Sequence, residues 1–314
     1  MKKAVYHAQR AVFTLNRVLG RFSDVIWVVG DGRSGTTWLT EILQTGLGYR
    51  TAFEPIHPVY VDEASDFPMF PYLAADERDP AMLSFLRRVF RGEAIHPRVA
   101  GGNRSLLYAG LLVKDIFANL LLAWAHRQFP DVRKVMILRH PFAVAVSKMH
   151  LSGPDWLWMD TPEIFLDRQP LFDDHLQPFE ETIRTATTPF ERLVTAWAVV
   201  HYVPFRQLQK GDILITFYEE LVQDPGEALQ GLLEELGVRD LSLSRMKRLQ
   251  AQIAQRSRTT PSDTAHSIQI DRWKKVLSRE EIDRGYTILD GFGLTEIYGH
   301  GTMPNRVAVE ALLQ

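Results

Sequence analysis

The segment from Gly30 to Trp38, GDGRSGTTW, gathers glycine, arginine, serine and threonine in one turn between an apolar run and a helical pattern. Glycines allow a tight turn and a close approach of the backbone to an anion. The N-terminus of the following helix offers free N–H groups and a partial positive charge. The turn therefore predicts a site for a phosphate or sulfonate group, and an ordinary turn with an incidental arginine is the alternative.

The cation of this turn stands in an unusual place for a nucleoside triphosphatase. Such a loop ends in Gly-Lys-Ser/Thr, with the lysine beside the outer phosphates. In this chain Thr36 occupies the lysine position, and the cation is Arg33, inside the turn. The pattern argues against a P-loop kinase, and it predicts that Arg33 holds one terminal phosphate or sulfonate.

A second candidate anion site lies in the segment RHPFAVAVS, from Arg139 to Ser147. Arg139 ends an apolar run, and Pro141 takes the first helical position, where its missing N–H costs nothing. Ser147 lies about two turns into that helix. Because ligands of open α/β sheets bind beyond the carboxyl ends of the strands, we expect Arg139 and Ser147 to face such a crevice.

The elements that must position these residues alternate between short apolar runs and helical patterns. Alternation of this kind predicts an α/β fold with a central parallel sheet flanked by helices, in a single domain over residues 1–314. The predicted strands are 25–29, 134–138 and 213–217, with a short further strand before Glu54. The predicted helices are 37–45, 106–128 (with an interrupted helix as the alternative), 141–150, 189–209 and 225–236. The pattern of residues 1–24 predicts an N-terminal amphipathic helix. Two segments, 55–101 and 151–178, predict substrate-covering loops, with helical insertions packed by their own aromatic residues as the alternative.

Composition and charge exclude several classes of protein. The chain has 314 residues, 46% of them hydrophobic, a net charge of −2 and no cysteine. Disulfide scaffolds, cysteine-rich zinc sites and thiol catalysis are therefore excluded, and nucleic acid is not a favoured partner. No run reaches the roughly 20 apolar residues of a membrane helix, and no compact metal pattern is present. We expect a cytoplasmic protein without a metal, and the N-terminal helix either packs against the domain or contacts a membrane surface.

Taken together, the motifs resemble those of the sulfotransferases that use 3′-phosphoadenosine 5′-phosphosulfate (PAPS). GRSGTTWLTEIL is similar to the family's 5′-phosphosulfate loop, with the arginine of the carbohydrate and tyrosyl-protein members. RHPFAVAVS is similar to the 3′-phosphate motif, and FYEELVQDP, from Phe217, is similar to a third family segment. The resemblance covers residues 25–293 and implies a P-loop-like sulfotransferase fold.

The resemblance also implies which residues bind the donor. The 5′-phosphosulfate would be held by Arg33, Ser34, Gly35, Thr36 and Thr37, and the 3′-phosphate by Arg139 and Ser147. Trp38 and Tyr218 would lie near the adenine, each with a core role as the alternative. Before Trp273, Ser257 and Arg272 match nucleotide-binding positions of the carbohydrate and tyrosyl-protein branch.

The catalytic base separates the two branches of the family. Small-molecule members carry a histidine two residues after the lysine that matches Lys114, and here that position is Ile116. The other branch carries a glutamate, often followed by proline, and Glu54 matches it. Glu54 is therefore the predicted general base, with apolar neighbours raising its pKa, and His57 is the alternative. Lys114 is expected to place charge near the sulfonate, and Asp115 to pair with Arg33 or Lys114.

The predicted activity is transfer of a sulfuryl group from PAPS to an acceptor hydroxyl. By analogy with phosphoryl transfer, the reaction needs a base for the hydroxyl and positive charge on the leaving phosphate, and no metal. The Glu branch implies an acceptor on a carbohydrate or glycolipid. The alternatives are a phosphoryl-transfer enzyme and a non-catalytic nucleotide-binding protein, and the oligomeric state stays open.

Overall fold

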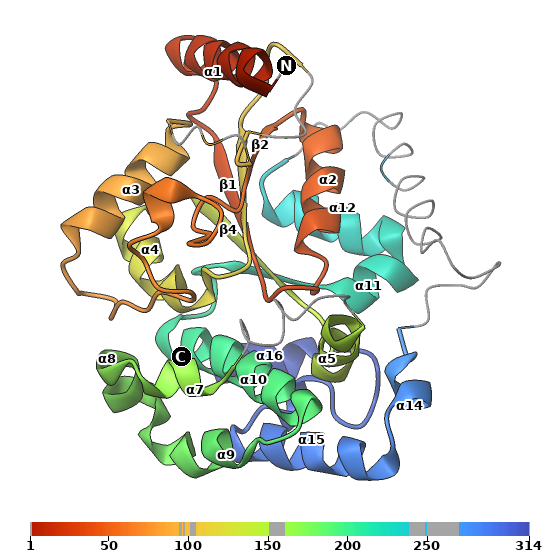
Figure 1. Ribbon diagram of the computed structural model, residues 1–314. Coiled ribbons are helices and arrows are strands. Elements are labelled where there is room, and N and C mark those ends of the chain that lie inside the picture. The colour runs from red at the N-terminus through yellow and green to blue at the C-terminus, as the bar shows by residue number, and fades with distance from the viewer. Residues whose placement is uncertain are drawn as a thin grey trace.

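A sheet of five parallel strands forms the centre of the computed structural model, in the order β2-β3-β1-β4-β5 (Figure 1). The structure describes residues 2–93, 96, 98–100, 105–150, 161–238, 249 and 270–313. The strands are β1 Val25–Val29, β2 Arg50–Phe53, β3 Leu111–Asp115, β4 Arg133–Leu138 and β5 Leu214–Phe217. The predicted α/β class, with a central parallel sheet flanked by helices, is confirmed.

Each face of the sheet is covered by helices. Trp27 and Val29 of β1 pack into the core on one face, whereas Ile26 and Val28 pack into the core on the other, because successive side chains of a strand alternate. Figure 1 shows α2 (Thr36–Leu47) and α12 (Pro225–Glu235) on one side, and α3 (Pro80–Phe90) and α4 (Leu122–Gln128) on the opposite side. Burial on both faces explains why β1 is an unbroken apolar run.

The predicted helix over 106–128 is wrong for its first half. Residues Leu111–Asp115 form β3, which pairs with both β1 and β2, and only the later part is helical, as the short turn η2 (Asn119–Leu121) and α4. A short apolar run such as LLVKD fits a buried strand and a buried helix equally well. Hydrogen bonding to two neighbouring strands decides between them.

The remaining helices surround the sheet. The helices α5 (Pro141–Met149), α10 (Pro189–Gln207), α2 and α12 lie where they are predicted, within a few residues. The helices α3, α7 (Glu163–Leu166) and α8 (Gln169–Leu171) lie in the two segments for which helical insertions are the alternative, as do the short helical segments η1 (Asp62–Ala64) and η3 (Phe172–Leu176). Helices without a sequence prediction are α9 (Glu180–Thr185), α11 (Tyr218–Gln223), α14 (Trp273–Val276), α15 (Arg279–Gly291) and α16 (Arg306–Leu312), with the short helical segments η4 (Gln177–Phe179) and η5 (Thr295–Ile297). Within 161–178, short helical turns bury Phe165, Leu171 and Leu176, which favours the helical-insertion interpretation for this part.

The N-terminal helix α1 (Lys2–Val18) packs against the domain by one face. Phe13 is fully buried, and the Asn16 amide donates hydrogen bonds to the carbonyl oxygens of Val12 and Leu106, both at 2.8 Å. The Asn16 side-chain oxygen accepts from the Tyr108 N–H at 2.9 Å. These contacts tie α1 to the segment that leads into β3.

No helix in the described ranges is both long enough and apolar enough to cross a membrane.

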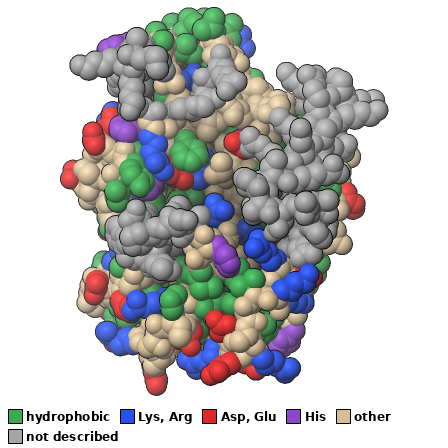
Figure 2. All heavy atoms as spheres, turned by 45° about the vertical axis from the view of Figure 1, so that its right-hand side comes forward, with side chains coloured by type: hydrophobic (Ala, Val, Ile, Leu, Met, Phe, Trp, Pro, Cys, Tyr) green, Lys and Arg blue, Asp and Glu red, His purple; other side chains and the backbone are tan. Residues whose placement is uncertain are grey.

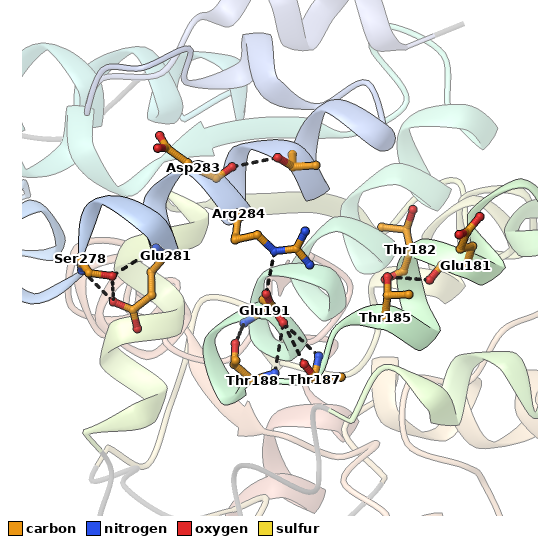
Figure 3. A network of polar contacts seen from close by, with 11 residues as sticks. Glu181, Thr182, Thr185, Thr187, Thr188, Glu191, Ser278, Glu281, Asp283 and Arg284 are labelled. Carbon is orange, nitrogen blue, oxygen red and sulfur yellow. Dashed lines mark hydrogen bonds and ion pairs between the residues drawn. The ribbon is translucent and has the colours of Figure 1, made fainter.

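A polar network joins the helices α10 and α15 (Figure 3). Thr188 and Glu191 form a capping box at the start of α10, and the other Glu191 oxygen accepts from Nε of Arg284, on α15, at 2.9 Å. Farther along α10, the Trp197 indole N–H donates to the carbonyl oxygen of Arg139 at 3.1 Å. The network therefore supports the helix that holds the end of β4 in place.

Loss of this cap should destabilise the protein measurably. Thr188→Ala leaves the Glu191 N–H without its side-chain acceptor, so we expect the free energy of unfolding to fall by about 1 kcal/mol, measured by urea titration. The control is Thr287→Ala, because Thr287 is exposed on α15 and its hydroxyl donates to the Asp283 carbonyl oxygen of the same helix, its one partner among the described residues. Equal losses in the two variants would contradict a stabilising role for the box.

Candidate active site

The carboxyl ends of all five strands carry residues that the sequence marks as candidates. The phosphate-loop turn follows β1, Glu54 follows β2, Lys114 is the penultimate residue of β3, Arg139 follows β4 and Tyr218 follows β5. After β1 the chain turns towards β2 at one edge of the sheet, and after β4 it turns towards β5 at the other edge. Divergence of this kind creates a crevice between the ends of β1 and β4, where ligands of open α/β sheets bind.

The phosphate-loop turn is shaped by two close approaches. Gly35 has φ 94°, and a Cβ there would lie 2.6 Å from Cδ2 of Tyr218. A Cβ on Gly30 would lie 2.6 Å from the carbonyl oxygen of Ile137 in β4. Only glycine fits at these positions, so the turn is held between β4 and the Tyr218 ring.

The start of α2 is open to a ligand. Gly35 is its N-cap residue and provides no side-chain acceptor for the first N–H groups of the helix. Thr36 is buried and Thr37 is exposed. Free N–H groups and the helix dipole together favour an anion at this end.

Two arginines from the two motifs lie next to each other in the crevice. Nε of Arg33 donates to Oγ of Ser147 at 3.1 Å, and Nη1 of Arg139 donates to the carbonyl oxygen of Arg33 at 2.9 Å. Within the described ranges, neither guanidinium forms an ion pair with a carboxylate. Partial burial lowers the pKa of Arg33, and the charge of Arg139 lowers it further, whereas Tyr218 acts to raise it. Two neighbouring cations without carboxylate partners in this part of the chain form a site for an anion.

Unpartnered donors point to the same conclusion. Oγ of Ser34 and Nε of Arg139 are both buried and have no hydrogen-bond partner among the residues that the structure describes. Buried polar atoms in native proteins are nearly always paired, so these two donors fit the oxygen atoms of a bound phosphate or sulfonate. Hence the residues of both motifs fit a nucleotide that carries two separate anionic groups.

A buried ion pair lies behind the phosphate-loop turn. Nζ of Lys148 is 2.9 and 3.0 Å from the two carboxylate oxygens of Asp31, and both side chains are almost completely buried. Asp31 is two residues before Arg33, and Lys148 follows Ser147. The pair therefore joins the first motif to the second, a link that the sequence analysis did not include.

Glu54 lies between two cations. Its Oε1 is 2.5 Å from Nζ of Lys114, and its Oε2 accepts from Nη2 of Arg98 at 2.8 Å. Burial acts to raise the pKa of Glu54, but the charge of Lys114 and the hydrogen bonds from Arg98 and Lys114 outweigh it, so the pKa lies below its ordinary value. The prediction of a raised pKa is therefore wrong, because the neighbours that count are charged. This pairing stabilises the fold above the pKa of an unfolded glutamate, about 4.3, and is lost as the pH falls through the lower folded value.

The backbone at this carboxylate is also unusual. Glu54 has φ 49°, in the left-handed region that side chains other than glycine rarely adopt, and its N–H donates to the carbonyl oxygen of Lys114 at 2.6 Å. Arg33 has φ 71°. Among the described residues only Phe70 shares this property, so two of three strained positions are candidate site residues. Such strain concentrates at functional sites.

His57, the alternative base, is buried close to Glu54. Its N–H donates to the Glu54 carbonyl oxygen at 3.1 Å, and its ring contacts those of Tyr60 and Phe117 at centroid distances of 4.4 and 5.1 Å. Nδ1 accepts from the Val59 N–H at 3.3 Å. Burial lowers the pKa of His57 to about 4, so its ring is neutral at pH 7.

The prediction that Asp115 pairs with Arg33 or Lys114 is wrong. Its carboxylate accepts from the Trp27 indole N–H at 2.8 Å and from the Ile56 N–H at 3.2 Å. Since side chains alternate along β3, Asp115 points to the opposite face of the sheet from Lys114. Burial raises the pKa of Asp115 to about 7.

The residues expected near the adenine lie together beside the turn. The Tyr218 ring meets the half-buried Trp38 edge-on at 5.3 Å, and the Arg139 guanidinium lies 4.4 Å from the Tyr218 centroid. Farther along, Arg272 is exposed, and the next residue, Trp273, stacks on His140 at 4.5 Å. This stack brings the segment of Arg272 next to the second motif. Ser257 lies outside the described residues.

Three residues of the site, Arg98, Asp31 and Lys148, are not predicted as functional from the sequence. Lys148 carried a usable signal, because a lysine within the apolar helix FAVAVSKM needs a partner if that helix is buried. Arg98 carried no sequence signal of a functional role, since it lies in a proline-containing segment far from any motif. Within the described ranges, no group of three or more His, Asp or Glu side chains is placed to hold a metal ion.

A model of the sulfotransferase family matches residues 25–242, more than two thirds of the chain. A search of the curated proteins finds no match.

Several solved sulfotransferase structures are similar to this chain over most of its length. A mouse sulfotransferase complexed with PAP (3′-phosphoadenosine 5′-phosphate) is 16% identical to this chain, and its TM-score is 0.43. The match covers 87% of this chain and 88% of the mouse chain. A sulfotransferase from Mycobacterium avium is 13% identical, covers 87% and 77%, and has a TM-score of 0.42. One from Alicyclobacillus acidocaldarius is 17% identical, covers 74% and 92%, and has a TM-score of 0.36. The family model, not these likenesses, carries the assignment.

The ion pair behind the turn gives a prediction about stability. Lys148→Met leaves the Asp31 carboxylate buried without a counter-charge, so the free energy of unfolding should fall by about 3–5 kcal/mol in a urea titration. The double variant Asp31→Asn with Lys148→Met removes both charges and should recover much of that loss. A double variant no more stable than the single one would show that the pairing of charges is not the cause.

Proposed function

The chain belongs to the sulfotransferase family, and on that premise we propose that it transfers a sulfuryl group from PAPS to a hydroxyl group of a carbohydrate or glycolipid. The observation that carries the choice of donor is the contact between Arg33 and Arg139, two cations without carboxylate partners in the described ranges, beside two buried unpartnered donors. A nucleotide with an anionic group at each end of its ribose satisfies both motifs at once. The family assignment argues against the phosphoryl-transfer alternative.

Each motif would hold one end of the donor. The turn from Arg33 to Thr37 and the open start of α2 would bind the 5′-phosphosulfate, and Arg139 with Ser147 would bind the 3′-phosphate. Trp38 and Tyr218 offer ring surfaces for the adenine, and Ser257 and Arg272 remain proposals for the 3′ side. PAPS supplies the activated sulfuryl group, and Arg33 and Lys114 would stabilise the negative charge that develops on its leaving phosphate.

Glu54 would accept the proton of the acceptor hydroxyl. Its low pKa keeps the carboxylate ionised at neutral pH and ready to take a proton, but two cations also make it a weak base. Loss of the Lys114 contact would raise the pKa of Glu54 towards the useful range. Lys114 can thus keep the Glu54 carboxylate ionised while the two are in contact, and make Glu54 a stronger base when the contact is lost.

The surroundings of Glu54 suit an acceptor with a ring and several hydroxyl groups. Val59 and Tyr60 are exposed, and the Arg98 guanidinium lies 4.1 Å from the Tyr60 centroid. An aromatic face beside a charged donor can pack on a sugar ring and bind its hydroxyl groups. The resemblance to the Glu branch supports the same acceptor class.

A transfer assay with variants of Glu54 tests the proposal. The purified protein is incubated with ³⁵S-labelled PAPS and a panel of glycans, glycolipids, phenols and steroids, and labelled products are counted. With the best acceptor, Glu54→Gln should lower turnover by about 10²-fold or more, because the amide cannot accept the proton. The rise in melting temperature that 3′-phosphoadenosine 5′-phosphate (PAP) produces should stay close to that of the wild type, although the variant itself melts at a lower temperature because Lys114 loses its buried carboxylate partner.

His57→Gln is the matched control, since it changes a buried neighbour that donates only its backbone N–H to Glu54. Unchanged turnover in Glu54→Gln together with a large loss in His57→Gln would move the base to His57. Label on phenols or steroids and not on glycans would reject the carbohydrate acceptor. Binding of PAP without transfer to any member of the panel would favour a non-catalytic nucleotide-binding role.

The second motif is tested by thermal melting with two nucleotides. PAP should raise the melting temperature of the wild type more than AMP does, because only PAP carries the 3′-phosphate. Arg139→Ala should remove this difference while the response to AMP remains. Since Arg139 also donates to the Arg33 carbonyl oxygen, a purely structural role would weaken both nucleotides equally, and that result would reject the 3′-phosphate assignment.

A further inference from the structure

Half of the large hydrophobic side chains that are exposed in the described part of the chain lie in one place. Ten such side chains are exposed, and five of them, with exposed fractions from 44% to 75%, belong to the C-terminal part of α1 or to the segment before β3. We call these five residues the α1 surface: Leu15, Val18, Leu19, Leu106 and Leu107. Figure 2 shows hydrophobic side chains gathered at the top of the molecule, over α1. A gathered apolar patch indicates an interaction site, whereas single exposed side chains need no explanation.

The α1 surface is continuous because of how α1 is held. The hydrogen bonds of Asn16 to Leu106 and Tyr108 keep the two parts of the surface together. The spacing of Ala8, Ala11, Leu15 and Val18 places them on one face of α1, and Leu19 directly follows the helix; all five are exposed. Phe13 and Asn16 lie on a different face, towards the domain. Hence α1 has a second apolar face, which the described part of the domain does not cover.

Positive charge accompanies this apolar face. The first 23 residues contain two lysines and three arginines, and no aspartate or glutamate, although the whole chain has a net charge of −2. Arg10 and Arg17 are seven residues apart, so they share a face of α1, and Arg21 follows the helix. Arg17 contacts Glu93 at 3.3 Å, whereas Arg10 and Arg21 are exposed without an ion pair in the described ranges. An apolar face beside a cationic one is the pattern of helices that lie in a membrane interface.

We propose that the α1 surface docks the protein on an anionic lipid surface, with Leu15, Val18 and Leu19 entering the interface and Arg10 and Arg21 facing the lipid phosphates. The surface lies at the amino ends of the strands, since α1 leads into β1 and Leu107 into β3 (Figure 1). The candidate active site lies at the opposite end of the strands, beyond their carboxyl ends. A docked molecule therefore keeps its nucleotide crevice turned away from the lipid and open to water.

Charge favours lipid over a second copy of this chain. A twofold dimer through the α1 surface would bring the arginines of two copies together without a carboxylate from the first 23 residues of either. An anionic lipid surface neutralises the same arginines. Docking of this kind is reversible and weakens as salt screens the charges.

Vesicle flotation of the full chain tests the proposal. We expect the protein to float with vesicles of phosphatidylglycerol and phosphatidylcholine at low ionic strength, and to stay in solution with pure phosphatidylcholine. The triple variant Leu15→Gln, Val18→Gln and Leu19→Gln should bind the anionic vesicles at least tenfold more weakly. The matched control is Val276→Gln with Val307→Gln, since these valines are exposed elsewhere, and it should bind as the wild type does.

Neutralising charge gives an independent measurement. Arg10→Gln with Arg21→Gln should weaken binding to anionic vesicles and flatten its dependence on salt. All variants should keep the wild-type melting temperature and its shift with PAP, which separates this proposal from the proposed function. Absence of flotation at low salt, or equal flotation of the triple variant, would overturn it. A wild-type dimer in light scattering that the triple variant dissociates, without vesicle binding, would assign the surface to a second copy.

Discussion

The hydrogen bond from the Arg139 guanidinium to the backbone of Arg33 sets the character of the whole site, because it brings two like charges near each other. Arg139 donates to the backbone of Arg33 while the Arg33 side chain donates to Ser147, so the two motifs hold each other in place. Such an arrangement is costly without an anion, because the cations repel and two buried donors remain unpartnered. The fold tolerates it because β1 and β4 are neighbours in the sheet and α10 fixes the end of β4 through Trp197. The proximity of the two anion motifs thus follows from the strand order.

A second cost lies on the acceptor side, where the backbone of Glu54 takes a left-handed conformation. That conformation costs about 1–3 kcal/mol and persists only where neighbours hold it. Here the neighbours are Lys114, which binds both the N–H and the carboxylate of Glu54, and Arg98, which binds the second carboxylate oxygen. The same two cations keep the carboxylate ionised. Position and protonation of the candidate base therefore have one physical origin.

Much of the fold and the two candidate anion motifs could be predicted from local patterns, and the surroundings of Glu54 could not. The turn from Gly30 to Thr37 lies within one strand–turn–helix unit, and Arg139 and Ser147 lie within another. Because the spacing inside each unit is fixed, each motif can be recognised from the sequence by itself. The sequence predicts a helix where β3 lies, because a five-residue apolar run has no periodicity that separates a strand from a helix. The raised pKa expected for Glu54 is wrong for a similar reason, since the cations that lower it, Lys114 and Arg98, come from 60 and 44 residues farther along the chain.

The sequence alone determined the alternating order of strands and helices, the two anion motifs, the absence of thiol chemistry and the basic character of the N-terminal segment. These are properties of residue type and short spacing, which the chain carries before it folds. Tertiary structure decided that Asp31 pairs with Lys148, that Asp115 faces Trp27 rather than a cation, and that one apolar face of α1 stays uncovered. Each of these depends on which side of the sheet or helix meets a segment distant in sequence, and local periodicity does not encode that choice.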